Sequence, residues 1–229
     1  MFWLSKSNQQ EIAAKTLKKY LHGIKAWHLL HKQTYPDAAN PRLKVLLRSS
    51  AGPNAVIPPK EKKGAIHLQH LMSLSEALVS VGPKEDAVLD LALVAFWGLA
   101  RIGKLTSPLP QGKVDPWTSF LTSNVMWEEF EGEQAIVLTL REAKTCCPSK
   151  TQEILLRPLS NMLCPVEAVK RRLIKSNGAD PPLLGYYDPN GERVHLTKDT
   201  VNKTLNDVWA KGSFGGLTGH SFRVGGASI

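Results

Sequence analysis

The sequence has few cysteines and no long apolar run, and each absence excludes a class of protein. Its three cysteines, Cys146, Cys147 and Cys164, are odd in number and lack metal-ligand spacing. A secreted scaffold built on disulfides is therefore excluded, and a reduced intracellular compartment is expected. The longest apolar run, 87–100, is interrupted by Asp90 and is too short to cross a bilayer. The first residues also lack the layout of a secretory signal.

Acidic residues are scarce in one part of the chain only. Residues 1–63 contain 12 Lys and Arg but only 3 Asp and Glu, whereas residues 64–229 contain 17 of each kind. The whole net charge of +9 therefore lies in the first quarter. A basic front end on a neutral body favours a polyanionic partner, most simply nucleic acid. A soluble protein with an ordinary basic surface is the alternative.

The basic first quarter predicts a helical domain over residues 1–50, followed by a linker. Apolar residues recur at steps of three and four between 8 and 33, which predicts one long helix, and a short helix is expected at 40–47. Lysines on the side opposite the apolar stripe either contact DNA phosphates or form a solvated face. The candidates for DNA binding are Lys15, Lys18, Lys19 and Lys25. Residues 51–64 are rich in proline, glycine and lysine, which predicts the linker.

Residues 65–229 predict a second domain that is mostly helical with a small antiparallel β-hairpin. Helices are expected near 67–81, 84–101, 165–175 and 197–210, with a final helix that starts near His220. The helix at 84–101 is apolar almost all round from Ala87, which predicts a central, buried helix. Strands are expected at 134–140 and 152–156, joined by a polar turn, and residues 176–196 read as a loop. The fold class is therefore mainly α.

Four residues of this domain could act on a phosphate. His220 and Arg223 are three apart at the start of the last helix, so they share one face and can grip one phosphate together. Arg101 is expected at the end of the buried helix, and Lys144 in the turn of the hairpin. Each of these residues also has an ordinary structural interpretation. Arg101 would extend from the helix end into solvent, and Lys144 would be a solvated lysine in a turn. His220 would cap its own helix, and Arg223 would pair with an acidic residue. Lys150 lies in the same turn as Lys144.

The order of these residues resembles that of the tyrosine recombinase (phage integrase) superfamily. Residues 95–101 and 219–226 carry most of the resemblance, with Lys144 between them, and crypton-like elements of fungi are the most similar group. The resemblance implies a two-domain clamp on DNA, in which residues 1–50 form the core-binding domain and residues 65–229 the catalytic domain. It also implies a nuclear protein of a mobile element that acts in DNA recombination and integration.

The resemblance assigns a role to each candidate. Arg101 and Arg223 would hold the scissile phosphate, His220 would assist proton transfer or positioning, and Lys144 would be the general acid. A tyrosine would attack and form a covalent phosphotyrosine, without metal, ATP or another cofactor. The partner is double-stranded DNA, on which the protein would form a homo-oligomer.

The sequence departs from the family pattern in ways that bear on activity. Lys104 stands where the family has an acidic residue. The family's nucleophilic tyrosine follows the His-x-x-Arg box at a distance, but this sequence ends six residues after Arg223. We therefore expect a C-terminally truncated recombinase that is inactive by itself, with a lowered stability or a tendency to self-associate. The alternatives are a non-catalytic DNA-binding protein derived from such a recombinase and, less favoured, an unrelated phosphoesterase.

Overall fold

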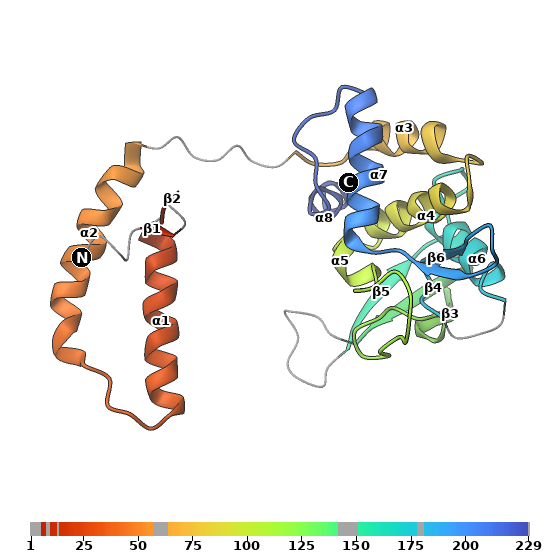
Figure 1. Ribbon diagram of the computed structural model, residues 1–229. Helices are drawn as coiled ribbons and strands as arrows, with labels where there is room; N and C mark the ends of the chain where they lie inside the picture. Colours follow the sequence, from red (N-terminus) through yellow and green to blue (C-terminus); the bar gives the residue numbers. More distant parts are fainter. Residues whose placement is uncertain are drawn as a thin grey trace. The chain divides into compact units, whose positions relative to one another are not determined.

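The computed structural model describes residues 6–7, 10–12, 14–56, 64–141, 151–177 and 181–228. It divides the chain into two compact units, Met1–Glu61 and Lys62–Ile229 (Figure 1). The described residues are mainly helical, with small antiparallel sheets, as the sequence predicts. None of the described helices is both long and apolar enough to span a membrane.

The first unit is a pair of helices with little core. Its elements are β1 (Lys6–Ser7), β2 (Gln10–Glu11), α1 (Ala14–Leu30), the 3-10 helix η2 (Asp37–Ala39) and α2 (Asn40–Val56). No residue of α1 is buried. The predicted apolar stripe is about half exposed, with 55% of Tyr20, 47% of Ile24 and 53% of Trp27 accessible. About half of the surface of these three side chains therefore stays accessible in the described part of this unit.

Two predicted boundaries in this unit are wrong. The first helix begins at Ala14 rather than near Asn8, because β1 and β2 pair through Lys6 with Glu11 and Ser7 with Gln10. The second helix continues to Val56, so residues 51–56, predicted as linker, are helical. Pro53 lies inside this helix, where a proline has no backbone N–H to donate to the carbonyl four residues before it.

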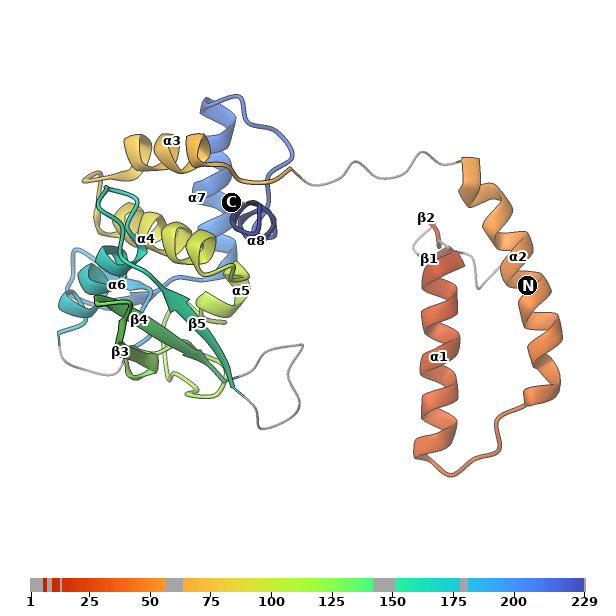
Figure 2. The same cartoon turned by 180° about the vertical axis from the view of Figure 1, so that it is seen from behind.

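The second unit is built around one buried helix. Its helices are α3 (Leu68–Leu78), α4 (Pro83–Trp97), α5 (Ile102–Leu105), α6 (Pro165–Ile174), α7 (Lys198–Lys211) and α8 (Ser221–Gly226). Helix α4 begins with Pro83 in its first turn and buries every residue from 87 to 96. It contacts α3, α6, α7 and α8, and Figure 2 shows it between α3 and the sheet. The prediction of a central buried helix is confirmed.

The predicted hairpin is part of a three-stranded sheet. Strand β4 (Glu133–Leu140) lies between β3 (Val125–Phe130) and β5 (Gln152–Leu156), and both pairings are antiparallel. Leu138 pairs with Val125 on one side and Ile154 on the other. The short 3-10 helix η3 (Thr122–Asn124) leads into β3. Strand β3 was not predicted, because its side chains are mostly exposed and do not alternate between apolar and polar.

The segment predicted as a loop at 176–196 contains a second hairpin. Strands β6 (Gly185–Tyr187) and β7 (Arg193–His195) pair through Tyr186 and Val194. Arg193 supports the hairpin by donating from Nη2 to the Pro182 carbonyl over 2.9 Å. Strands of three residues carry too short a pattern for sequence analysis to recognise, which explains the error.

Candidate functional site: a cationic pocket around His220

Helix α8 is held in place by the backbone around Ser221. The Thr218 amide donates to Ser221 Oγ over 3.0 Å, and the Ile66 amide donates to the Ser221 carbonyl over 3.1 Å. Ser221 and Phe222 are fully buried. His220 occupies the N-cap position, so the predicted start of this helix is confirmed. These contacts fix the first turn of α8, which carries His220 and Arg223.

Two glycines allow α8 to lie directly against other backbone segments. A Cβ atom at Gly225 would overlap the Ile66 carbonyl, and one at Gly226 would overlap the Phe96 carbonyl of α4. Glycine is the only residue that permits such a close approach without displacing the neighbouring backbone. Gly225 and Gly226 therefore place the helix with Arg223 against the carboxyl end of α4.

The structure corrects the position of Arg101. Helix α4 ends at Trp97, where Leu99 takes a left-handed conformation (φ 50°) and the Ala100 amide donates to the Ala95 carbonyl over 2.9 Å. This is the Schellman arrangement, here with leucine in the place that glycine usually takes. The chain reverses, and Arg101 becomes the N-cap residue of the short helix α5. Arg101 is therefore exposed in a turn after the buried helix.

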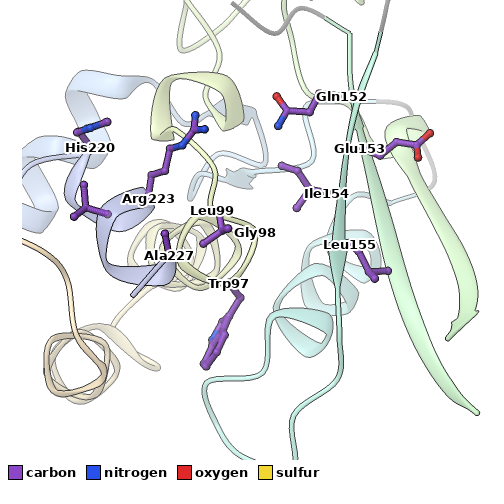
Figure 3. Close-up of a pocket in the computed structure, with 11 residues that line it drawn as sticks. Trp97, Gly98, Leu99, Gln152, Glu153, Ile154, Leu155, His220, Arg223 and Ala227 are labelled. Atoms are coloured by element: carbon purple, nitrogen blue, oxygen red, sulfur yellow. The ribbon is translucent and has the colours of Figure 1, made fainter. Parts of the chain in front are cut away.

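His220 and Arg223 line one cavity of about 520 Å³. The other walls are the end of α4, at Trp97 to Leu99, and strand β5. Figure 3 shows Gln152 of β5 directed toward Arg223, whereas the carboxylate of Glu153 points away from it. The cavity therefore presents a guanidinium, an imidazole and an amide to a ligand, above an apolar floor.

His220 also lines a second cavity, of about 540 Å³, together with Arg101. Lys104 of α5 and Lys198 of α7 line it too, with Asn202 and Asn206. His220 thus belongs to both cavities, with Arg223 in the first and Arg101 in the second. Lys144 lies outside the described residues, as does Lys150, so the choice between these two lysines stays a prediction.

The cations of the two cavities have no side-chain partner within the described part of the chain. Arg101, Lys104, His220 and Arg223 form neither a side-chain hydrogen bond nor an ion pair there. Two of the alternatives considered for the sequence, His220 as a side-chain cap and Arg223 as the partner of an acid, are thus not seen among these residues. Unpaired cations at a cavity attract anionic groups such as phosphates. The individual roles of these residues stay predictions.

Polar residues that sequence analysis missed also line the cavities. Gln152 opens strand β5, and Lys198, Asn202 and Asn206 lie on α7. The three residues of α7 repeat at intervals of four, a spacing that places them on one helix face. This spacing was visible in the sequence, but a polar face on a helix does not by itself indicate a ligand.

The lysines predicted to bind DNA in the first unit are all exposed. Lys25 is 3.8 Å from Asp37 and lies over the ring of Tyr35, which joins α1 to the turn after it. Lys19 borders an exposed apolar groove on α1 with Ile24 and Trp27. Their contact with DNA stays a prediction.

All four tyrosines of the sequence lie in the described part of the chain, and the two of the second unit, Tyr186 and Tyr187, line neither cavity. Tyr20 and Tyr35 belong to the first unit. Tyr186 and Tyr187 lie in β6, where burial raises the pKa of Tyr186 and the Tyr187 hydroxyl donates to the Ser176 carbonyl over 3.4 Å. The described residues also contain no cluster of His, Cys, Asp or Glu suited to a metal ion.

No family model matches this sequence, and no curated protein is similar to it. Three solved recombinase structures are similar to this chain, each with a TM-score below 0.5. A Flp recombinase–Holliday junction complex is 13% identical, with a TM-score of 0.45 over 91% of this chain and 47% of that chain. The XerA recombinase is 15% identical, with a TM-score of 0.42 over 97% of this chain and 69% of that chain. XerH site-specific recombinase bound to its difH substrate is 15% identical, with a TM-score of 0.48 over 99% of this chain and 63% of that chain. This chain thus spans about half the length of the Flp chain that it resembles.

Proposed function

We propose that this chain binds the backbone of double-stranded DNA at the cavities around His220 and acts in DNA recombination by the tyrosine-recombinase reaction. The observation that carries the proposal is the group of basic side chains without acidic partners among the described residues: Arg101, Lys104, His220 and Arg223. Cations that the fold leaves unpaired beside a cavity are available to phosphate oxygens. The motif order in the sequence supports the recombinase reaction in particular.

The chemistry of strand transfer explains these residue types. Attack on a phosphodiester builds negative charge on the non-bridging oxygens, and guanidinium groups already in place stabilise that charge. Arg223 and Arg101 would supply the two guanidiniums, and His220, which lines both cavities, would donate a further hydrogen bond. Lys144 would protonate the leaving 5′ oxygen as general acid. In this proposal the residues of the chain supply the charge stabilisation without metal or ATP.

The nucleophile is the part of this reaction that the site does not supply. Neither tyrosine of the second unit, Tyr186 or Tyr187, lines the cavities. We propose that the chain derives from a mobile element, works in the nucleus and assembles as a homo-oligomer on DNA. The alternative is a non-catalytic DNA-binding protein derived from such a recombinase, which would use the same cations only as backbone contacts.

A salt titration of DNA binding tests the first part of the proposal. Binding of a random-sequence 40-base-pair duplex is measured by fluorescence anisotropy between 50 and 300 mM NaCl. We expect Arg101→Gln and Arg223→Gln each to weaken binding and to lower the slope of log K against log [salt] by about 0.9. Arg157→Gln is the matched control, because Arg157 pairs with Glu131 and lines neither cavity. Equal effects of all three variants would refute the phosphate site.

A transition-state mimic separates the recombinase from the simple binder. Orthovanadate at a nick in the duplex imitates the five-coordinate phosphorus of strand transfer. A site complementary to the transition state binds the mimic more tightly than the ground state. We expect at least about 10-fold tighter binding of the nicked duplex with vanadate, lost in Arg223→Gln. An affinity that vanadate leaves unchanged favours the non-catalytic alternative.

A further inference from the structure

A buried histidine lies against the segment that leads into the candidate site. His70 of α3 is only 6% exposed, and its ring packs edge-on against two aromatic rings. One belongs to Trp209, near the end of α7, and the other to Phe214, in the turn that follows α7. The ring centroids of His70 and Phe214 are 4.5 Å apart. The turn that contains Phe214 continues into His220 and α8, so His70 packs against the connection between α7 and α8.

A hydrogen bond of the same histidine holds the other backbone segment that contacts α8. The His67 amide donates to His70 Nδ1 over 2.8 Å. The amide one residue earlier, that of Ile66, donates to the Ser221 carbonyl at the start of α8. Because Nδ1 accepts a hydrogen bond, the neutral ring of His70 carries its proton on Nε2. One imidazole therefore contacts both of the segments that place the first turn of α8.

Protonation of His70 removes this hydrogen bond and creates a charge in a buried position. Both nitrogens of an imidazolium are donors, so Nδ1 can no longer accept from the His67 amide. Trp209 and Phe214, which face the ring from α7 and the turn after it, carry no charge to compensate the new one. Burial, and after it the charge of His67 on the same helix, lower the pKa of His70 below its ordinary value of 6.5. The folded chain therefore favours the neutral ring.

We propose that His70 is a pH-sensitive switch for the candidate site. Its neutral ring holds the backbone around Ile66 and Phe214, and its protonation in mildly acidic solution releases both segments and displaces His220 and Arg223. The effect on phosphate binding is opposite to that of protonating His220 itself, which adds a positive charge to the cavity. The consequence for DNA binding rests on the proposed function, whereas the displacement of α8 does not.

An NMR titration of the ¹⁵N-labelled chain between pH 7.5 and 5.5 tests the switch without DNA. The Ile66 amide is the reporter, because its hydrogen bond to the Ser221 carbonyl depends on the position of α8. We expect its proton to move toward lower chemical shift as this bond lengthens, with a midpoint below 6.5. The Leu138 amide in the central strand β4 is the internal control and should stay fixed. An Ile66 amide that does not move in the wild-type chain overturns the inference.

Two variants assign the transition to its histidine. In His70→Gln the side-chain amide oxygen, at the third position of the helix, can accept from the His67 amide at every pH, as in a capping box. The Ile66 transition should therefore disappear. His195→Gln is the matched control and should keep the transition, because burial also lowers the pKa of His195 but this residue lies in β7. His67 and His220 are present in both variants, so a transition that survives in His70→Gln belongs to another histidine and overturns the inference.

DNA binding at the two pH values separates the switch from the proposed function. The random-sequence duplex is titrated at pH 7.5 and 5.5, and the ratio of the two dissociation constants is compared between chains. The affinity lost on acidification should be about 10-fold greater in the wild type than in His70→Gln, which corresponds to one hydrogen bond to a charged group. The contribution of His220 cancels, because both chains contain it. Equal ratios overturn the control of the site by His70. A wild-type chain that binds no DNA at either pH refutes the proposed function, and the Ile66 amide then still decides whether His70 moves α8.

Discussion

The second unit contains two groups of arginines that differ in whether an acidic side chain pairs with them. Asp90 of α4 holds two arginines of α6: Arg172 Nε lies 2.6 Å from Asp90 Oδ2, and Arg171 Nε donates to Asp90 Oδ1 over 3.0 Å. Arg172 and Asp90 are almost completely buried. Arg101 and Arg223 have no acidic partner within the described residues and lie at open cavities.

The difference separates arginines that hold the fold from those available to a ligand. A buried charge must be paired, because an unpaired one loses its hydration without compensation. An exposed cation keeps its hydration and costs the fold little. The first group is therefore expected to control stability, and the second to control binding.

Removing the buried acid should have the largest effect on stability. Substitution Asp90→Ala leaves the guanidinium of Arg172 buried without its counter-charge, which costs about 3–5 kcal/mol. Urea unfolding followed by circular dichroism measures the loss. Arg171→Ala is the control, because Arg171 is 43% exposed and should cost far less. A loss below about 1 kcal/mol in Asp90→Ala would contradict the structural role of this group.

A substitution that adds a methyl group between α8 and the backbone behind it should have the second largest effect on stability. In Gly225→Ala the new methyl group meets the Ile66 carbonyl, and the shift that follows should cost about 3 kcal/mol. Because α8 carries Arg223, DNA affinity should fall with stability. Gly215→Ala, where no atom lies within 4 Å of the new Cβ, should be nearly neutral in the same unfolding assay. Equal urea midpoints of the two variants would show that the close approach is not maintained in solution.

Acid should weaken the fold by a smaller amount. Burial lowers the pKa of His70 and of His195 below the ordinary 6.5, so the folded chain binds fewer protons than the unfolded chain just below that pH. Stability is therefore expected to fall as the pH decreases from 6.5 toward the lowered values. Urea midpoints at pH 7.5 and 5.5 measure this loss, which should shrink in His70→Gln/His195→Gln.

The smallest effect on stability is expected at the cavities themselves. Arg101→Gln and Arg223→Gln should change the free energy of unfolding by no more than about 0.5 kcal/mol, since neither side chain has a partner to lose among the described residues. The same unfolding assay as for Asp90→Ala gives the direct comparison. A loss of about 2 kcal/mol or more, which is typical of a substitution in the core, would show that these arginines stabilise the fold.

Much of the second unit could be predicted, because local signals there agree with tertiary packing. Pro165 marks the first turn of α6, and Thr197 caps α7 as predicted. Strand β5 has the bounds that its sequence pattern predicts. The sequence predicts the burial of α4, because a helix that is apolar on all sides must be surrounded by a core.

The errors in the predicted elements arose at segments whose conformation depends on tertiary contacts rather than on the local sequence. The end of α4 depends on Leu99 in a left-handed conformation, which a leucine does not signal in advance. Strand β3 is formed by pairing with β4 rather than by a pattern of its own. The sequence did identify His220 and Arg223 as neighbours, because three positions along a helix fix their spacing. It could not show that Gln152 and Asn202 lie near them, since those contacts join distant segments.

The backbone that enters the second unit lies alongside the segment that carries the site. The Gly64 amide donates to the Gly216 carbonyl over 3.3 Å, and the Ile66 amide donates to the Ser221 carbonyl. Ile66 also belongs to the hydrophobic core around α4, so this short stretch of backbone joins the core to the segment that carries His220 and Arg223. Any displacement of the main chain at Gly64 or Ile66 therefore also displaces the backbone of these two residues.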